Sequence, residues 1–386
     1  MMLQMTASPA MIVPSSFRRA LAVPLLLLTV AGCASLPRTP YSNSDAAMSR
    51  VLDVEGLRRY TDEPISKFGM QRIGPGAATY LALSGGGADG AYGVGVLNGW
   101  TTAGTRPTFS VVSGVSTGGL IAPFAFLGPQ YDVVLRELYT SGIAETLLED
   151  SNPLRVLFGS GLVGNRRLRE LVARYVGPDI LQAVAREYAK GRRLLVVTTD
   201  LDTQRTVIWD MGRIATIGTT EALDLFRDVM TASASIPVVF PPMLIQAEAD
   251  GRSFQEMHVD GGVTAPVLTL PDALLFQGQV PPKGLHLDIF ILVNNKIERD
   301  FELVNNGSIE VASRSMSLVT KMQTRSIVFS TYEFARRNHL GFHLSYIERE
   351  YPSSNSSGFD TAYMRALYQY GYEKAAGGHA WTTVPP

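Results

Sequence analysis

The sequence has a single cysteine, no surplus of basic residues and few charged residues overall. Its 386 residues include 34 Lys and Arg against 35 Asp and Glu, and charged residues make up 18% of the chain. One cysteine cannot form an internal disulfide, a Cys-rich zinc site or an iron–sulfur cluster. A net charge of −1 gives no reason to expect nucleic acid as a partner, because neutralising phosphates requires clustered basic side chains. The 46% of hydrophobic residues is typical of a folded chain with a large core.

The one cysteine, Cys33, follows an apolar run near the start of the sequence. Two arginines precede the run Ala20–Val30, and two small residues separate the run from Cys33. This pattern is typical of a secretory signal peptide, and the run is shorter than the ~20 residues that span a bilayer. Small residues directly before a cysteine resemble the bacterial lipobox, in which that cysteine is lipidated. We therefore expect residues 1–32 to be a lipoprotein signal peptide, with an ordinary signal peptide and a chance cysteine as the alternative.

The segment after Cys33 is polar, contains proline and serine, and has no hydrophobic periodicity. We interpret residues 33–75 as a lipidated N-terminus and a tether that lets a folded domain stand off from the membrane. Because Ala34 rather than Asp follows the cysteine, the resemblance to lipoproteins implies anchoring in the bacterial cell envelope at the outer membrane. The inner membrane and secretion are the alternatives. No basic amphipathic helix stands out, so membrane contact would depend on the acyl anchor.

From residue 76 to about residue 380, short apolar runs alternate with longer segments of helical spacing. The runs typical of buried or half-buried strands are Thr79–Ser84, Thr108–Ser113, Arg193–Thr199, Arg205–Trp209 and His286–Val293. The segments that predict helices are Arg166–Tyr175, Asp179–Lys190, Glu221–Thr231, Phe359–Ala376 and Ile309–Arg337, the last as one helix or two broken near Ser315–Ser317. Strands separated by helices indicate βαβ units around a mainly parallel sheet. We therefore predict one α/β domain over residues 76–380.

A glycine-rich turn follows the first of these strands. Gly85, Gly87 and Gly90 match the pattern G-x-G-x-x-G, but residues 105–115 contain no Asp or Glu, and no Lys-Ser/Thr pair follows the turn. These absences exclude a dinucleotide-binding fingerprint and a P-loop. Two interpretations remain: a turn whose N–H groups stabilise an anion such as a developing oxyanion, or a tight turn without function.

The second strand is followed by a G-x-S-x-G pattern. Gly114, Ser116 and Gly118 lie between the strand Thr108–Ser113 and the apolar helix Leu120–Leu127. A serine at such a turn occupies a strained backbone position, and the helix that follows places partial positive charge near a developing oxyanion. At this glycine content the pattern also arises by chance, so the strand–turn–helix context is what indicates a nucleophile.

A serine hydroxyl becomes an effective nucleophile only with a base within hydrogen-bond reach. The usual base is a histidine oriented by a carboxylate, and the five histidines are His258, His286, His339, His343 and His379. None of them has a convincing catalytic context, and we interpret His258 as a strand histidine with a structural role. Asp260 is an alternative base, because Gly261 and Gly262 follow it and allow close approach.

The order of the three motifs resembles that of the patatin-like phospholipase family. GGGxxG is followed by GxSxG about 30 residues later and then by a distant DGG. Three further stretches agree with the family pattern: Ala232–Pro242, Thr199–Thr203 and Phe359–Glu373. The resemblance covers roughly residues 79–376, with the motif core at about 81–273, and implies a three-layer α/β/α sandwich around a mainly parallel sheet.

The resemblance also implies roles for individual residues. Ser116 would be the nucleophile, and Asp260 the general base of a Ser–Asp dyad without histidine. The amides of Gly85, Gly86 and Gly87 would form the oxyanion hole. No metal and no cofactor is implied. An unperturbed Asp has a pKa near 3.9 and is a weak base at neutral pH, so we expect apolar surroundings to raise the pKa of the Asp260 carboxyl.

One position departs from the family pattern. The fifth residue of the glycine-rich motif is usually Arg or Lys, and here it is Asp89, which cannot donate positive charge to an oxyanion. Backbone amides can still serve as donors, and losing one such donor typically costs about 2.7–4 kcal/mol. We therefore expect activity to persist with an altered rate or substrate, although the departure lends some support to a pseudoenzyme.

These observations predict a membrane-anchored serine acyl hydrolase that cleaves lipid esters through an acyl-enzyme and acts in lipid degradation. A phospholipid or lysophospholipid would be its substrate, as for a phospholipase A or lysophospholipase. The apolar stretches Leu120–Gly128 and Glu145–Gly161 favour an acyl pocket or a lid, with ordinary core packing as the alternative. Two other functions stay open: an α/β-hydrolase-type esterase with a Ser-His-Asp triad, and a lipid-binding outer-membrane lipoprotein without activity.

Overall fold

The computed structural model describes residues 38–68, 77–147, 162–237, 239–278, 284, 286–301, 303–352 and 358–386. These residues belong to one compact unit, which spans Arg38–Ser151 and Gly161–Pro386. Cys33 and the predicted signal peptide lie outside the described residues, as do residues 148–161 of the stretch predicted to form a lid or pocket wall.

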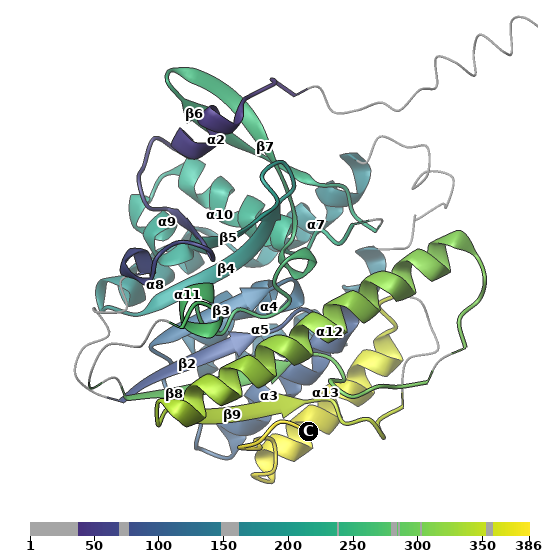
Figure 1. Cartoon of the computed structure of the whole chain (residues 1–386). Helices are drawn as coiled ribbons and strands as arrows, with labels where there is room; N and C mark the ends of the chain where they lie inside the picture. The colour runs from purple at the N-terminus through teal and green to yellow at the C-terminus, as the bar shows by residue number, and fades with distance from the viewer. Residues whose placement is uncertain are drawn as a thin grey trace, which may run out of the picture. The chain divides into compact units, whose positions relative to one another are not determined.

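A central sheet connects all nine strands of the described residues (Figure 1). The strands are β1 (Arg58–Tyr60), β2 (Ala77–Leu83), β3 (Val111–Val115), β4 (Arg193–Asp200), β5 (Arg205–Asp210), β6 (Met243–Ala249), β7 (Arg252–Asp260), β8 (His286–Val293) and β9 (Gly341–Tyr346). Five neighbours in the order β4-β3-β2-β8-β9 run parallel. The strands β5, β1 and the β6–β7 hairpin extend this parallel core with antiparallel pairs.

Helices cover both faces of the sheet, as the α/β prediction requires. The helices are α2 (Asn43–Met48), α3 (Gly90–Thr102), α4 (Thr117–Leu127), α5 (Asp132–Thr140), α7 (Leu162–Tyr175), α8 (Pro178–Ala189), α9 (Met211–Ile217), α10 (Thr220–Ser233), α11 (Asp272–Leu275), α12 (Ser308–Arg337) and α13 (Thr361–Ala376). In Figure 1, α12 crosses in front of the sheet. No helix in the described part of the chain is long and apolar enough to cross a membrane.

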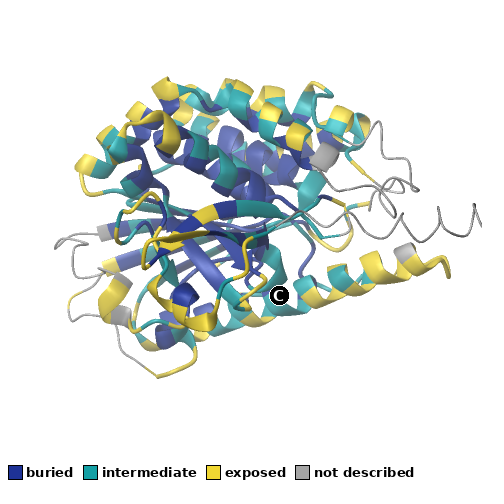
Figure 2. Ribbon diagram, turned by 90° about the horizontal axis from the view of Figure 1, so that it is seen from above, coloured by how far each residue is buried: buried dark blue, intermediate teal, exposed yellow. Residues whose placement is uncertain are grey.

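Two apolar cores on opposite faces of the sheet give the fold its three layers. Successive strand residues point to opposite faces, so Leu81 and Leu83 pack into the core shared with α3, α4, α10 and α13. Tyr80 and Ala82 face the other way and pack into the core shared with α11 and α12. Figure 2 shows buried residues gathered on the sheet and on the helix surfaces turned towards it. The predicted three-layer α/β fold is therefore confirmed.

Element boundaries differ from the sequence prediction at two places. Strand β3 starts three residues later than predicted, where Val111 pairs with Tyr80, and runs on to Val115, which pairs with Val197. Helix α12 is unbroken through Ser315, whose hydroxyl donates to the carbonyl of Val311 at 2.7 Å. A serine that bonds four residues back is tolerated in a helix interior.

The sequence analysis missed the β6–β7 hairpin. Its two-residue turn is Asp250–Gly251, and both residues have positive φ angles, 48° and 74°. An Asp-Gly pair between alternating strands is a strong hairpin signal, so the information was present in the sequence. The hairpin matters because its second strand, β7, ends at Asp260.

The predicted tether is wrong over residues 38–68, which pack against the domain. Arg38 forms an ion pair with Asp202, and the ring of Tyr41 stacks on that of Phe254 at 4.4 Å between centroids. Strand β1 adds an edge to the sheet by pairing with β5. The polar character of this segment reflects these ion pairs and edge positions rather than a free linker.

A buried ion pair fixes the same segment to the β7 strand. Arg58 and Glu256 form it with side chains only 9% and 2% exposed. Burial alone would raise the pKa of Glu256, but the hydrogen bonds from Arg58 and His258 outweigh it and hold this pKa well below its usual range. Removing one partner of a buried pair leaves an uncompensated charge and is strongly destabilising.

Helices α3 and α13 approach each other through glycines. A Cβ atom at Gly95 would lie 2.1 Å from the carbonyl oxygen of Tyr368, and one at Gly99 would lie 2.2 Å from that of Tyr372. Distances this short leave no room for a side chain. The two helix backbones are therefore in direct contact, which makes α13 a rigid support for α3.

We expect Gly99→Ala to destabilise the protein by about 1–3 kcal/mol, because the added methyl group forces the two helices apart. Urea denaturation followed by circular dichroism measures the change. The exposed α12 residue Ser326 provides the control: Ser326→Ala should shift the free energy of unfolding by less than about 0.5 kcal/mol. Equal stability of the Gly99→Ala variant and the unsubstituted protein would contradict the close contact.

Candidate active site

Ser116 lies on a sharp turn between β3 and α4. Its backbone angles are φ 55° and ψ −126°, a left-handed region that a residue with a side chain rarely adopts. The Ser116 N–H donates to the hydroxyl oxygen of Ser233 at 3.0 Å, which holds the turn. The serine is only 4% exposed and lines an apolar pocket. This is the strained strand–turn–helix geometry of a nucleophile elbow.

The glycines of the G-x-S-x-G pattern are required by close packing. A Cβ atom at Gly118 would lie 2.5 Å from the Leu83 carbonyl oxygen, and one at Gly114 would lie 2.2 Å from that of Gly118. Gly90 at the start of α3 faces the same turn, because a Cβ atom there would lie 2.3 Å from the Thr117 hydroxyl. Side chains at these positions would push the elbow away from β2 and α3.

Asp260, the last residue of β7, lies beside Ser116. Its Oδ1 accepts the Gly262 N–H at 2.7 Å, and its Oδ2 is buried without a hydrogen-bond partner among the described residues. The Ser116 hydroxyl is near enough to lower the pKa of Asp260, although it does not reach hydrogen-bond geometry with Oδ2. A Cβ atom at Gly261 would lie 2.5 Å from the carbonyl oxygen of Val197, so glycine after the Asp is a packing requirement.

The carboxyl group of Asp260 titrates far above its ordinary range. Burial raises the pKa of Asp260 to about 7, against the lowering effects of the Ser116 hydroxyl and the Gly262 N–H. Burial disfavours the charged form, because the apolar surroundings replace the water that would solvate it. A carboxylate with such a pKa has the basicity that a proton acceptor needs near neutral pH.

The glycine-rich loop ends β2 next to the elbow, and one of its amides is not available to an oxyanion. The Gly85 N–H donates to the carbonyl of Pro266 at 3.0 Å, so the sequence-based inclusion of Gly85 in an oxyanion hole is wrong for this conformation. The amides of Gly86 and Gly87 donate to no described residue. Gly87 has a φ of 55° and lines the pocket together with Ser116.

Asn294 supports this loop and was missed by the sequence analysis. Its side-chain Nδ2 donates to the Ser84 carbonyl at 2.9 Å, and its backbone N–H donates to the Ser84 hydroxyl at 2.8 Å. A Cβ atom at Gly86 would lie 2.0 Å from the Asn294 carbonyl oxygen. Asn294 directly follows β8, which pairs with β2, and nothing local to its sequence marks it as part of a site.

The stretch Ala232–Pro242 contacts both members of the predicted dyad. The Ser233 hydroxyl accepts the Ser116 N–H, and the Ser235 carbonyl accepts the Asp260 N–H at 3.0 Å. The Ser235 hydroxyl also donates to Asn165 of α7 at 3.3 Å. The agreement of this stretch with the family pattern was the only sequence signal for Ser233 and Ser235, and none pointed to Asn165.

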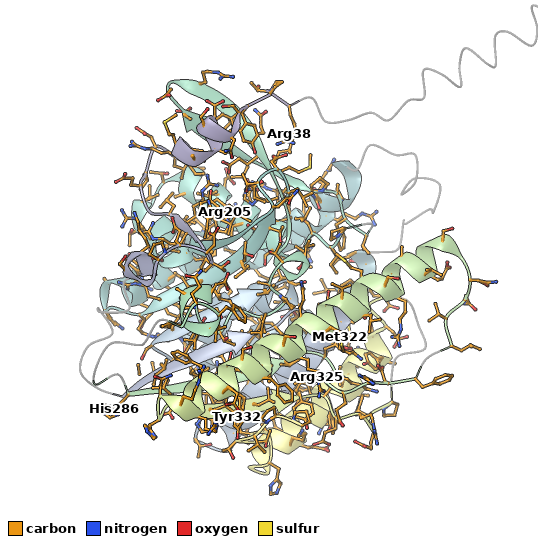
Figure 3. The ribbon with its side chains drawn as sticks, in the orientation of Figure 1. Arg38, Arg205, His286, Met322, Arg325 and Tyr332 are labelled. Atoms are coloured by element: carbon orange, nitrogen blue, oxygen red, sulfur yellow. The ribbon has the colours of Figure 1, made fainter. Side chains whose placement is uncertain are left out.

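None of the five histidines, all of which are described, lines the pocket that contains Ser116. His258 is fully buried and bonds to the hydroxyl of Thr198 at 2.9 Å and to Glu256 at 3.4 Å, as its structural interpretation predicted. His286 lies at the amino end of β8 (Figure 3). Ser116 follows the carboxyl end of β3, which runs parallel to β2 and β8. His286, at the amino end of β8, therefore lies at the opposite ends of the parallel strands from Ser116.

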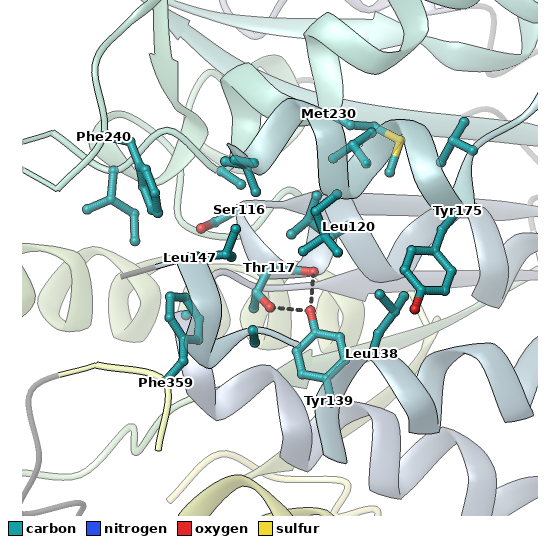
Figure 4. Close-up of a pocket in the computed structure, with 18 of the residues that line it drawn as sticks. Ser116, Thr117, Leu120, Leu138, Tyr139, Leu147, Tyr175, Met230, Phe240 and Phe359 are labelled. Atoms are coloured by element: carbon teal, nitrogen blue, oxygen red, sulfur yellow. Dashed lines mark hydrogen bonds between the residues drawn. The ribbon is translucent and has the colours of Figure 1, made fainter. Parts of the chain in front are cut away.

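A narrow apolar pocket with a cavity volume of about 70 Å³ extends from Ser116 (Figure 4). Leu147, Phe240 and Phe359 lie at the end near the Ser116 hydroxyl, and Leu138, Met230 and Tyr175 lie towards the other end, with Leu120 between. The hydroxyl of Tyr139 bonds to that of Thr117 in the pocket wall. Leu120 and Leu147 come from the two apolar stretches that favoured an acyl pocket.

The described residues contain no group of three or more His, Cys, Asp or Glu side chains placed to hold a metal ion.

Comparison with known proteins identifies the family. The family model described as patatin-like phospholipase matches residues 81–271, which include Ser116, Asp260 and the glycine-rich loop. No curated protein matches the chain. The solved structure of VipD from Legionella pneumophila is similar at 13% identity with a TM-score of 0.33, covering 91% of this chain and 73% of that chain. On the strength of the family match, the chain belongs to the patatin-like phospholipase family.

Proposed function

We propose that this protein hydrolyses lipid esters with Ser116 as nucleophile and Asp260 as general base. The observation that carries the proposal is their placement: a strained serine lines an apolar pocket, beside a buried carboxyl group with a pKa of about 7. Membership of the patatin-like phospholipase family implies lipid acyl hydrolysis. The identity of the two residues and the dyad mechanism are the parts that we propose.

In the first step, the Ser116 hydroxyl oxygen attacks the ester carbonyl while its proton passes to Asp260. The Oδ2 atom is the acceptor, because Oδ1 is already bonded to the Gly262 N–H. The amides of Gly86 and Gly87, which donate to no described residue, would stabilise the oxyanion together with the amino end of α4. Asp260 then returns the proton to the leaving alcohol, and an acyl-enzyme remains.

In the second step, a water molecule attacks the acyl-enzyme. Asp260 takes a proton from that water, and the oxyanion forms again at the same amides. Collapse of the intermediate releases the fatty acid and returns the proton from Asp260 to Ser116. The same carboxylate therefore serves as base in both halves of the reaction, and no histidine is needed.

The pocket supports a fatty acyl chain as the group that is transferred. Its wall is built almost entirely of aliphatic and aromatic side chains from α4, α5, α7 and α10, and a narrow apolar cleft favours an alkyl chain over a polar group. We therefore propose phospholipid or lysophospholipid as the substrate class. The triad esterase receives no support from the geometry, because none of the five histidines lines the pocket.

We also propose that the protein reaches its substrate from a membrane, held by a lipid on Cys33. The support is the apolar run and the small residues before Cys33 in the sequence. Anchoring would confine the enzyme to the surface where lipid esters lie. The outer membrane remains the proposed location, with the inner membrane and secretion as alternatives.

We expect Ser116→Ala and Asp260→Asn to lower kcat by at least about 100-fold, because each removes a group that acts in the transition state. The assay measures p-nitrophenol release from medium-chain esters and fatty acid release from phospholipid vesicles. Ser113→Ala is the matched control: Ser113 is a buried serine on β3 whose hydroxyl donates to the Leu268 carbonyl. It should keep kcat within about threefold, a change of less than ~1 kcal/mol in the barrier.

Three outcomes would decide between the functions. If one folded His→Ala variant is as inactive as Ser116→Ala, the dyad is wrong and the triad esterase is correct. If the unsubstituted protein binds lipid vesicles but turns over no ester, it is a lipid-binding protein without activity. The proposal is supported if Ser116→Ala and Asp260→Asn lose activity while every His→Ala variant keeps it.

The pH profile tests the role of the Asp260 carboxylate. The base must be ionised, and the raised pKa of about 7 means that ionisation is lost as the pH falls through 7. We therefore expect kcat/KM to fall about tenfold per pH unit below 7 and to level off above it. An uncharged ester substrate avoids titration of the substrate itself. A profile that stays flat down to pH 5 would contradict the assignment.

The anchor has its own test. Cys33→Ser should abolish metabolic labelling of the full-length protein by radioactive palmitate in a bacterial host, because the thiol that accepts the lipid is gone. Membrane fractions should then lose the protein while its esterase activity persists. Unchanged labelling would refute lipidation at Cys33, and labelling absent from both proteins would favour the ordinary signal peptide.

A further inference from the structure

Asp89 occupies the position where the family pattern has a basic residue, and the structure gives it a partner. Its Oδ1 accepts the hydroxyl proton of Tyr363 at 2.8 Å. Tyr363 lies in the first turn of α13, where its own N–H donates to Asp360 at 2.7 Å. The side chain and the backbone of Tyr363 are therefore both fixed. Asp89 directly precedes α3 but does not cap it with its side chain.

This hydrogen bond connects the glycine-rich loop to a rigid support. The Asp89 N–H donates to the carbonyl of Gly86 at 3.0 Å, so the backbone of Asp89 closes the turn that carries the Gly86 and Gly87 amides. At Gly87 an added Cβ atom would meet no atom of the described residues within 4 Å, whereas at Gly86 it would lie 2.0 Å from the Asn294 carbonyl oxygen. Packing therefore holds the loop at Gly86 but does little to hold it at Gly87. The contact with Tyr363 supplies the restraint that packing lacks.

The support itself is firm because α13 packs on α3 with glycines at the contact. A Cβ atom at Gly371 of α13 would lie 2.4 Å from the carbonyl oxygen of Tyr92 in α3. The loop between β2 and α3 is therefore held by the Gly85 N–H on Pro266, by Asn294 at Ser84 and Gly86, by the start of α3, and by Asp89 on α13.

In this contact the side chain at position 89 is the acceptor. Tyr363 donates its proton, and Lys or Arg side chains carry only donors. Burial raises the pKa of Asp89 to about 6, although the Tyr363 hydroxyl and the charges of Lys296 and Lys321 lower it. The carboxyl group is thus mostly ionised at neutral pH, and a hydrogen bond to an ionised acceptor is stronger than one to a neutral acceptor.

We propose that Asp89 is a positioning residue that fixes the Gly86 and Gly87 amides in place through its hydrogen bond to Tyr363 of α13. The inference rests on the proposed function, in which these amides stabilise the oxyanion. Asp89 acts on the reaction only through the loop, because its negative charge cannot stabilise an oxyanion. The Asp that replaces the usual basic residue at position 89 therefore helps to hold the loop in place.

Four variants test the contact. Asp89→Ala removes the acceptor and Tyr363→Phe removes the donor, so each should lower kcat by about 10- to 100-fold with KM changed less than threefold. The double variant should be no worse than the poorer single variant, because both remove the same bond. Asp89→Asn keeps an acceptor oxygen and should restore kcat to within about fivefold of the unsubstituted enzyme.

The matched control is Tyr370→Phe, on the same helix. The Tyr370 hydroxyl also donates to a carboxylate, that of Glu348 at 2.8 Å, but it does not contact the loop. This variant should keep kcat and KM. Amide hydrogen exchange, measured by mass spectrometry on peptides that cover residues 84–90, adds a readout independent of turnover. Exchange should quicken in Asp89→Ala and Tyr363→Phe but not in Tyr370→Phe.

The outcomes separate this inference from the proposed function. If the unsubstituted protein hydrolyses no ester, the proposed function fails, and the exchange data alone decide whether the contact holds the loop. If it is active and Tyr363→Phe behaves like Tyr370→Phe in both kcat and exchange, the positioning role is wrong. A tenfold gain in kcat for Asp89→Asn would also overturn it, because the charge rather than the hydrogen bond would then govern the rate.

Discussion

The site depends on keeping an ionisable carboxyl group in an enclosed, apolar place beside a serine hydroxyl. Asp260 has one oxygen bonded to the Gly262 N–H, and its other oxygen has no partner among the residues that the structure describes. Solvation would return its pKa to the ordinary range, where a carboxylate is a weak base. Gly118 packs on the backbone of Leu83, and Gly261 packs on that of Val197, so closely that neither position has room for a side chain. This packing is what brings a serine and a carboxyl from distant parts of the chain into one enclosure.

The position of that carboxyl depends in turn on residues far from the pocket. Strand β7, which ends at Asp260, carries Phe254 under the ring of Tyr41 and Glu256 in its ion pair with Arg58. The segment that reads as a polar tether thus helps to support the strand that ends at Asp260. The other side of the site is supported in the same way, since the glycine-rich loop is held by Asn294, which follows β8, and by Tyr363 of α13.

Sequence reasoning succeeded where a feature is local and periodic. The buried strands, the turn at Ser116 and the DGG motif each have a pattern that a few neighbouring residues define, and the parallel core follows from strands that alternate with helices. It failed where a feature depends on partners. The role of Gly85 could not be predicted, because the carbonyl that takes its N–H belongs to Pro266. Asn294, Ser233 and Asn165 are ordinary residues until the fold brings them to the site.

The sequence by itself determined the family, the α/β fold class and the two residues proposed to react, because motifs and periodicity are properties of the chain. The tertiary structure supplied the physical reason why Asp260 rather than His258 lies beside Ser116. Both lie on β7 two residues apart, but the His258 ring is bonded to Thr198 and Glu256, whereas Asp260 ends the strand beside the serine. The tertiary structure also decided the role of Asp89. Its carboxylate can hold the glycine-rich loop only because the fold brings the hydroxyl of Tyr363, which is distant in sequence, within hydrogen-bond distance.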